Sequence, residues 1–207
     1  MTEPKLQQSA VDYAGFWFKS ECAFIDALSG GEYVVRLQAL QRAAGYFRIA
    51  RTMRKAYDVG IGRQRLAPAL DVLDPWCKRR VNEATLPQVV RSLREEIGAA
   101  YGGRDLLSAA TKFLWLLHRD TVIIFDSQVR GALGSPYGDY DGFLERWRTG
   151  YAEVQDAVRS ACTELPATEV SRFARKAVSQ DAIEHVADNE WFRRRVYDIY
   201  LWRRGAP

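Results

Sequence analysis

Residues 106–126 read Leu-Leu-Ser-Ala-Ala-Thr-Lys-Phe-Leu-Trp-Leu-Leu-His-Arg-Asp-Thr-Val-Ile-Ile-Phe-Asp and hold two apolar runs. Each run carries one charged residue: Lys112 interrupts the first, and Asp126 ends the second. The first run is long enough for a buried helix, whereas Thr121–Ile124 is a short β-branched segment that is too short to build a sheet alone. Asp is a favoured N-cap residue, so we predict that Asp126 begins a helix over 127–133.

Most of the remaining chain also has helical periodicity, which predicts an all-α fold. The expected helices cover residues 10–28, 32–57, 69–80, 86–100 behind a Thr85 cap, 143–163, 168–178, 181–187 and 190–203. No pair of strands is recognisable. We expect a single domain over residues 1–207, with two helical lobes as an alternative whose division falls near 60–68 or 134–142.

The basic residues are unusual in type, with 24 arginines and only six lysines, and the sequence pI is about 9.0. Arginine matches phosphate oxygens in geometry, so this balance is compatible with binding a nucleic-acid backbone. An arginine-rich composition inherited from a GC-rich genome accounts for it equally well.

Several classes of protein are disfavoured by what the sequence lacks. The three cysteines are far apart, no phosphate-binding glycine motif occurs, and no apolar stretch is long enough to span a membrane. The polar N-terminus has no signal-peptide pattern. We therefore expect a cytoplasmic protein with no metal, no nucleotide cofactor and no membrane partner.

Lys112 is the only lysine between Arg79 and Arg175. Arginine stays protonated, whereas a desolvated lysine can lose its proton and act as a nucleophile. If Ser108 caps the helix, the helix dipole adds to this effect, and if Asp105 is the cap, Lys112 lies one turn deeper and the dipole matters less. The alternatives are a lysine that reaches solvent from a buried helix, and a structural ion pair between Lys112 and Asp126.

The pattern of Thr111-Lys112 followed by Val122-Ile123-Ile124-Phe125-Asp126-Ser127-Gln128-Val129 resembles the active-site segment of helix-hairpin-helix DNA glycosylases, and in particular their 8-oxoguanine glycosylase-like branch. The closing segment 191–202 is similar to the last helix of small bacterial members. This resemblance implies a two-lobed helical fold. The hairpin is degenerate here, because only Gly102-Gly103 stands where the family has Leu-Pro-Gly-Val-Gly.

The resemblance also implies roles for individual residues. Lys112 corresponds to the amine that attacks the sugar and forms a Schiff base, and Asp126 to the carboxylate that activates it and stabilises positive charge on the sugar. The residues that correspond to contacts with DNA or with the flipped base are Gln128, Leu116, Arg194, and one of Tyr197, Tyr200 and Trp202.

From these residues we expect a monomeric DNA N-glycosylase, with or without abasic-site lyase activity. Its partner would be double-stranded DNA that contains a modified base, which the enzyme flips out and excises. The setting would be base-excision repair or defence against phage with modified DNA. The alternative is a helical DNA-binding or protein-interaction module without catalysis.

Overall fold

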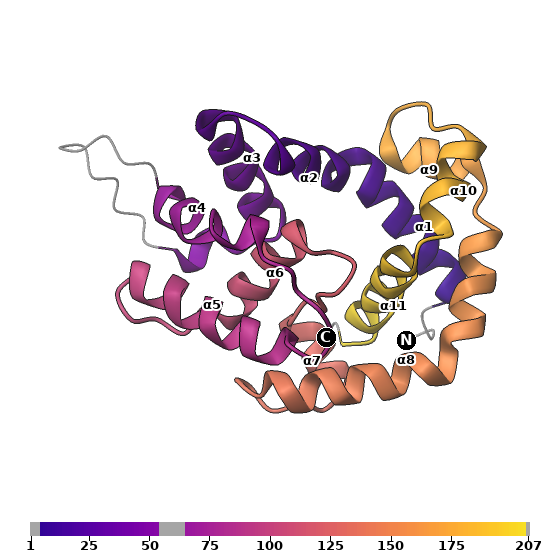
Figure 1. Cartoon of the computed structure of the whole chain (residues 1–207). Coiled ribbons are helices and arrows are strands. Elements are labelled where there is room, and N and C mark those ends of the chain that lie inside the picture. The colour runs from indigo at the N-terminus through magenta and orange to yellow at the C-terminus, as the bar shows by residue number, and fades with distance from the viewer. Residues whose placement is uncertain (1–4, 54–64, 206–207) are drawn as a thin grey trace. The chain divides into compact units, whose positions relative to one another are not determined.

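The computed structural model describes residues 5–53 and 65–205. Within these ranges the chain has eleven α-helices, one π-helical and two 3₁₀ turns, and no strand, so the predicted all-α class is confirmed (Figure 1). No helix in the described ranges is long and apolar enough to cross a membrane.

The chain packs into two compact units, which divide after Cys22 and after Ile124. Of the two expected divisions, the one near 134–142 lies inside unit 1, and residues 60–64 of the other lie outside the described ranges. Unit 1 holds α1 (Leu6–Phe16), the π-helical turn η1 (Trp17–Glu21), α7 (Ser127–Ala132), α8 (Tyr140–Thr163), α9 (Ala167–Ala174), α10 (Gln180–Ala187) and α11 (Glu190–Arg204).

Unit 2 is built from the middle of the chain. Its elements are α2 (Cys22–Ser29, of which Cys22 belongs to unit 1), α3 (Tyr33–Tyr46), η2 (Ala50–Thr52), α4 (Ala67–Leu73), η3 (Trp76–Lys78), α5 (Leu86–Ala100) and α6 (Leu107–Leu117).

The last helix, α11, forms the centre of unit 1, where it packs against α1, α7, α8 and α10. Most of its side chains are buried, including Trp191, Phe192, Val196 and Leu201. A helix that is covered on nearly all sides must place some polar residues in the core. For this reason α11 carries a buried arginine and a buried aspartate among its aromatic residues.

In unit 2, α5 and α6 pack against each other and are joined by a turn that contains two glycines. Gly102 and Gly103 both have positive φ angles, of 81° and 76°, and the N–H of Gly103 donates to the carbonyl of Gly98 at 2.8 Å. Glycine is the residue that adopts such angles without strain. Gly102-Gly103 therefore ends α5 as expected and leads the chain into the helix that holds Lys112.

Two predicted helices end early because an arginine takes the left-handed conformation. The helix expected over 32–57 ends at Tyr46. Two residues later Arg48 has φ 56°, and the N–H of Ile49 donates to the carbonyl of Ala44. The helix expected over 168–178 ends at Ala174, before Arg175 with φ 57°. Glycine is usual at this position, so no sequence signal marked either end. Residues 54–57 of the first prediction lie outside the described ranges.

Two more predictions change in detail. The helix expected over 69–80 ends at Leu73, and a 3₁₀ turn follows. Asp74 keeps helical backbone angles, but Pro75 has no N–H to continue the helical hydrogen bonds. The helix expected over 10–28 begins earlier, at Leu6, and the π-helical turn η1 separates α1 from α2.

Candidate functional site

Lys112 lies in the second turn of α6, a helix whose other residues are mostly apolar. Its exposed fraction is 7%, and the next residue in the chain, Phe113, is fully buried. The side chain is therefore buried along the helix and does not extend into solvent.

The N-cap of α6 is Leu106, so neither of the two expected residues takes that position. Asp105 Oδ1 accepts a hydrogen bond from the N–H of Leu107 at 3.2 Å, and Ser108 lies inside the helix. The helix dipole acts most strongly on the first turn of a helix, and Lys112 lies beyond that turn.

Asp126 is the N-cap residue of α7, as the sequence predicts. Its backbone is extended (φ −112°, ψ 146°), and its side chain accepts a hydrogen bond from the N–H of Gln128 at 3.0 Å. The side chain is half-buried. A capped carboxylate of this kind is held in one direction.

Gln128, the predicted contact to the DNA backbone, lies in the first turn of α7. The residue is half-buried, and its side-chain Oε1 is buried with no hydrogen-bond partner among the described residues. The end of α11 passes very close to it, because a Cβ placed on Gly205 would clash with the backbone carbonyl of Gln128. Glycine at position 205 allows α11 to pack tightly against the helix that Asp126 caps.

The three aromatic candidates on α11 differ in their accessibility. Tyr197 is buried between Trp147 and Tyr151, with ring centroids 5.2 and 5.5 Å away, and burial raises its pKa to about 12. Tyr200 is half-buried and stacks on Tyr197 at 6.2 Å. Trp202 is 41% exposed. Among these three rings, that of Trp202 is the most available to a ligand from solvent.

The remaining predicted site residues are Arg194 and Leu116. Arg194 is half-buried, and its Nε lies 3.4 Å from the Glu190 carboxylate, one turn earlier on α11. Leu116 is 2% exposed within unit 2. The predicted residues thus belong to both units: Lys112 and Leu116 to unit 2, and Asp126, Gln128, Arg194, Tyr197, Tyr200 and Trp202 to unit 1.

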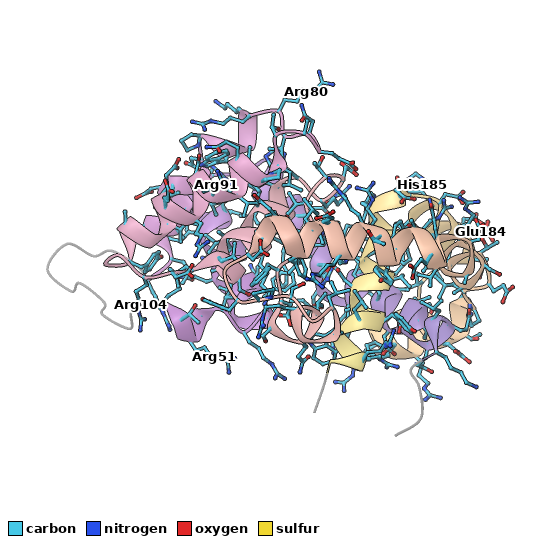
Figure 2. The ribbon with its side chains drawn as sticks, turned by 90° about the horizontal axis from the view of Figure 1, so that it is seen from below. Arg51, Arg80, Arg91, Arg104, Glu184 and His185 are labelled. Carbon is cyan, nitrogen blue, oxygen red and sulfur yellow. The ribbon has the colours of Figure 1, made fainter. Side chains whose placement is uncertain are left out.

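Some of the arginines of unit 2 are engaged in the fold, and others are exposed. Arg36 forms an ion pair with Asp74 and also contacts the sulfur of Cys77. Arg51 is exposed. Thr52 follows it in the chain, and the backbone carbonyl of Thr52 accepts a hydrogen bond from Nη1 of Arg104 at 2.9 Å. Figure 2 shows the side chains of Arg51 and Arg104 at the surface of unit 2. The basic residues Arg54 and Lys55 lie outside the described ranges.

One group of polar residues was not predicted as a site. Glu21, Arg195 and Asp198 are all buried in unit 1, and Trp147 joins them through its indole N–H. The signal was present in the sequence as the spacing of Arg195 and Asp198, which are three residues apart on one stripe of an otherwise aromatic helix. Burial raises the pKa of Asp198 to about 6, although Arg195 and the Trp147 hydrogen bond both act to lower it.

In the described ranges, no group of three or more His, Cys, Asp or Glu side chains is placed to hold a metal ion. Comparisons of the chain with models of protein families, with curated proteins and with solved structures found no match.

Proposed function

We propose that this protein is a DNA N-glycosylase that uses Lys112 as an amine nucleophile. The observation that carries the proposal is the burial of Lys112, 7% exposed on a helix of apolar residues, in a chain that otherwise uses mostly arginine. Lysine can act as a nucleophile where its amine is shielded from water in an apolar setting.

The proposed reaction begins when the lone pair of Lys112 Nζ attacks C1′ of the target nucleotide. The bond from C1′ to the base breaks, and the base leaves with the electron pair and takes up a proton. The sugar ring then opens as the remaining nitrogen proton passes to the ring oxygen, which leaves an imine between Lys112 and C1′. Water hydrolyses this imine and regenerates the amine.

Asp126 supplies the negative charge that this reaction needs. Positive charge develops on the sugar as the base departs, and a fixed carboxylate stabilises it more than mobile solvent does. The hydrogen bond from Gln128 N–H holds the Asp126 side chain in one direction.

Binding of DNA would rest on exposed arginines and on one exposed aromatic ring. Extruding a base from the duplex costs a few kcal/mol, which phosphate contacts must offset. Arg51 and Arg104 are suited to this role, because both are exposed on unit 2. Trp202 is the α11 side chain best suited to stack on a base.

Reductive trapping tests the proposal. Wild-type protein, Lys112→Gln and the exposed-lysine control Lys176→Gln are incubated with sodium borohydride and a duplex that carries one abasic site. We expect a covalent protein–DNA adduct with wild type and with Lys176→Gln, and none with Lys112→Gln. If wild type binds the duplex but forms no adduct with abasic or modified DNA, the protein is a DNA-binding module and the glycosylase proposal is wrong.

A further inference from the structure

Three charged side chains are buried together in unit 1. The exposed fractions of Glu21, Asp198 and Arg195 are 1%, 2% and 8%. Arg195 Nη1 donates to Asp198 Oδ2 at 3.1 Å, and Arg195 Nη2 lies 3.6 Å from Glu21 Oε1. Trp147 Nε1 donates to the other oxygen of Asp198 at 2.6 Å. We call these four residues the buried ionic cluster.

The cluster joins three separate parts of unit 1. Asp198 and Arg195 lie on α11, Trp147 lies on α8, and Glu21 ends the π-helical turn η1. π-helical turns are rare and often occur at functional sites. The ring of Tyr13, from α1, lies 5.4 Å from the Arg195 guanidinium. The cluster therefore fixes the position of α11 relative to α8 and relative to the segment formed by α1 and η1.

Stability alone is a poor reason for such a cluster. Replacing buried ion pairs by well-packed apolar residues is often neutral or stabilising, because each buried charge loses its hydration. The surroundings here are aromatic, with Trp147 and Tyr151 of α8 packed against Tyr197 of α11, and an apolar residue at position 198 would suit them. A buried carboxylate in this setting indicates a specific role.

The structure connects the cluster to Asp126. α11 packs directly on α7, the helix that Asp126 caps, and Gly205 brings the end of α11 against the backbone of Gln128. Asp126 is also among the groups that raise the pKa of Asp198, after the larger effect of burial. Because Coulomb interactions are mutual, the charge on Asp198 acts on Asp126 in turn.

We propose that Asp198 is a positioning residue for Asp126. The buried ionic cluster holds α11 against α7, and the presence or absence of a proton on Asp198 determines how much negative charge lies near the Asp126 carboxylate. This inference rests on the proposed function. A protonated Asp198 removes the repulsion toward ionised Asp126, and an ionised Asp198 restores it. The other groups that face Asp198 are Arg195 and Tyr197 from α11 and Trp147 from α8, with Glu21 behind Arg195.

The pH dependence of trapping tests this role. The rate of adduct formation with a single-abasic-site duplex is measured from pH 5 to 8 with sodium cyanoborohydride. The variants are Asp198→Asn, Trp147→Phe and Asp188→Asn, an exposed aspartate of unit 1. We expect wild type and Asp188→Asn to share an inflection near pH 6 that Asp198→Asn lacks. In Trp147→Phe, which loses a hydrogen bond to the carboxylate, the inflection moves to higher pH.

The outcomes separate this inference from the proposed function. If wild type forms no adduct, both are wrong. If wild type forms an adduct and its profile coincides with that of Asp198→Asn, the positioning role alone is wrong. If circular dichroism shows that Asp198→Asn does not fold, Trp147→Phe provides the test. A pH profile of Trp147→Phe with the same inflection as wild type contradicts the inference.

Discussion

The side chain of Asp126 accepts a hydrogen bond from the backbone N–H of Gln128 at 3.0 Å, which makes Asp126 the N-cap of α7. Capping accounts for an aspartate at this position without any catalysis. The cap and the proposed chemistry are nevertheless compatible, because the bond that stabilises the helix also aims the carboxylate. Experiments must therefore separate the two contributions.

Replacing Asp126 by asparagine separates them, because asparagine caps helices about as well as aspartate. We expect Asp126→Asn to change the free energy of unfolding by less than about 1 kcal/mol and to abolish adduct formation. The matched control is Asp139→Asn, since Asp139 caps α8 through the N–H of Gly142 at 2.9 Å. Urea denaturation and trapping are measured for both. Equal trapping by the two variants would assign Asp126 to capping alone.

The exposed arginines of unit 2 are expected to contact phosphates. Arg51→Gln and Arg104→Gln should each reduce the slope of log K against log salt concentration by about 1, because one phosphate contact is lost. Arg36→Gln, whose guanidinium is engaged with Asp74, should leave the slope unchanged. The slopes come from fluorescence-anisotropy titrations of a labelled duplex. If all three variants reduced the slope by the same amount, the net charge of the protein, and not the particular side chains of Arg51 and Arg104, would govern DNA binding.

Trp202 and Tyr197 should respond differently to truncation. Trp202→Ala removes an exposed ring and is expected to weaken DNA binding by about 1–3 kcal/mol, with little change in stability. Tyr197→Ala removes a buried ring and should destabilise the fold by about 3–5 kcal/mol. Thermal unfolding and binding are compared for the two variants. Unaltered DNA affinity in Trp202→Ala would exclude this residue and leave Tyr200 as the α11 candidate.

The stability of the protein should depend on pH through Asp198. Burial raises the pKa of this residue to about 6, from an ordinary value of 3.8. Between these values the folded chain holds a proton that the unfolded chain releases, so this contribution is complete below about pH 4 and is lost as the pH rises to about 6. At about 1.4 kcal/mol per pKa unit, the loss is on the order of 3 kcal/mol.

Urea denaturation at pH 4, 5, 6 and 7 measures this effect. Asp198→Asn should be less sensitive to pH than wild type over this range, whereas the exposed-aspartate variant Asp188→Asn should follow wild type. Identical pH dependence in wild type and Asp198→Asn would show that Asp198 does not titrate between pH 4 and 6.

The helices were predictable where their ends carry residue-specific signals. α5 has the predicted bounds, with Pro87 in its first turn and Gly102-Gly103 after it. The end of α3 was missed, because Arg48 occupies a left-handed position that glycine usually takes. The π-helical turn Trp17–Glu21 was missed as well, since one widened turn hardly disturbs a helical pattern of apolar residues.

The candidate site shows a similar limit. The Asp126 cap follows from local sequence and was predicted. The difference between buried Tyr197 and exposed Trp202 was not predictable, because α11 is covered on nearly all sides and its sequence has no clear polar face. The burial of Asp198 depends on partners far away in the sequence, Trp147 and Glu21, which no local pattern identifies.

The central claim is that the amine of Lys112 attacks the sugar, and mapping the trapped adduct tests it most directly. Wild-type protein is reduced with borohydride on abasic DNA, digested with protease and nuclease, and sequenced by tandem mass spectrometry. We predict that the residual sugar is attached to Lys112. Attachment to the N-terminal amine or to another lysine, such as Lys19, Lys78 or Lys176, would contradict the account.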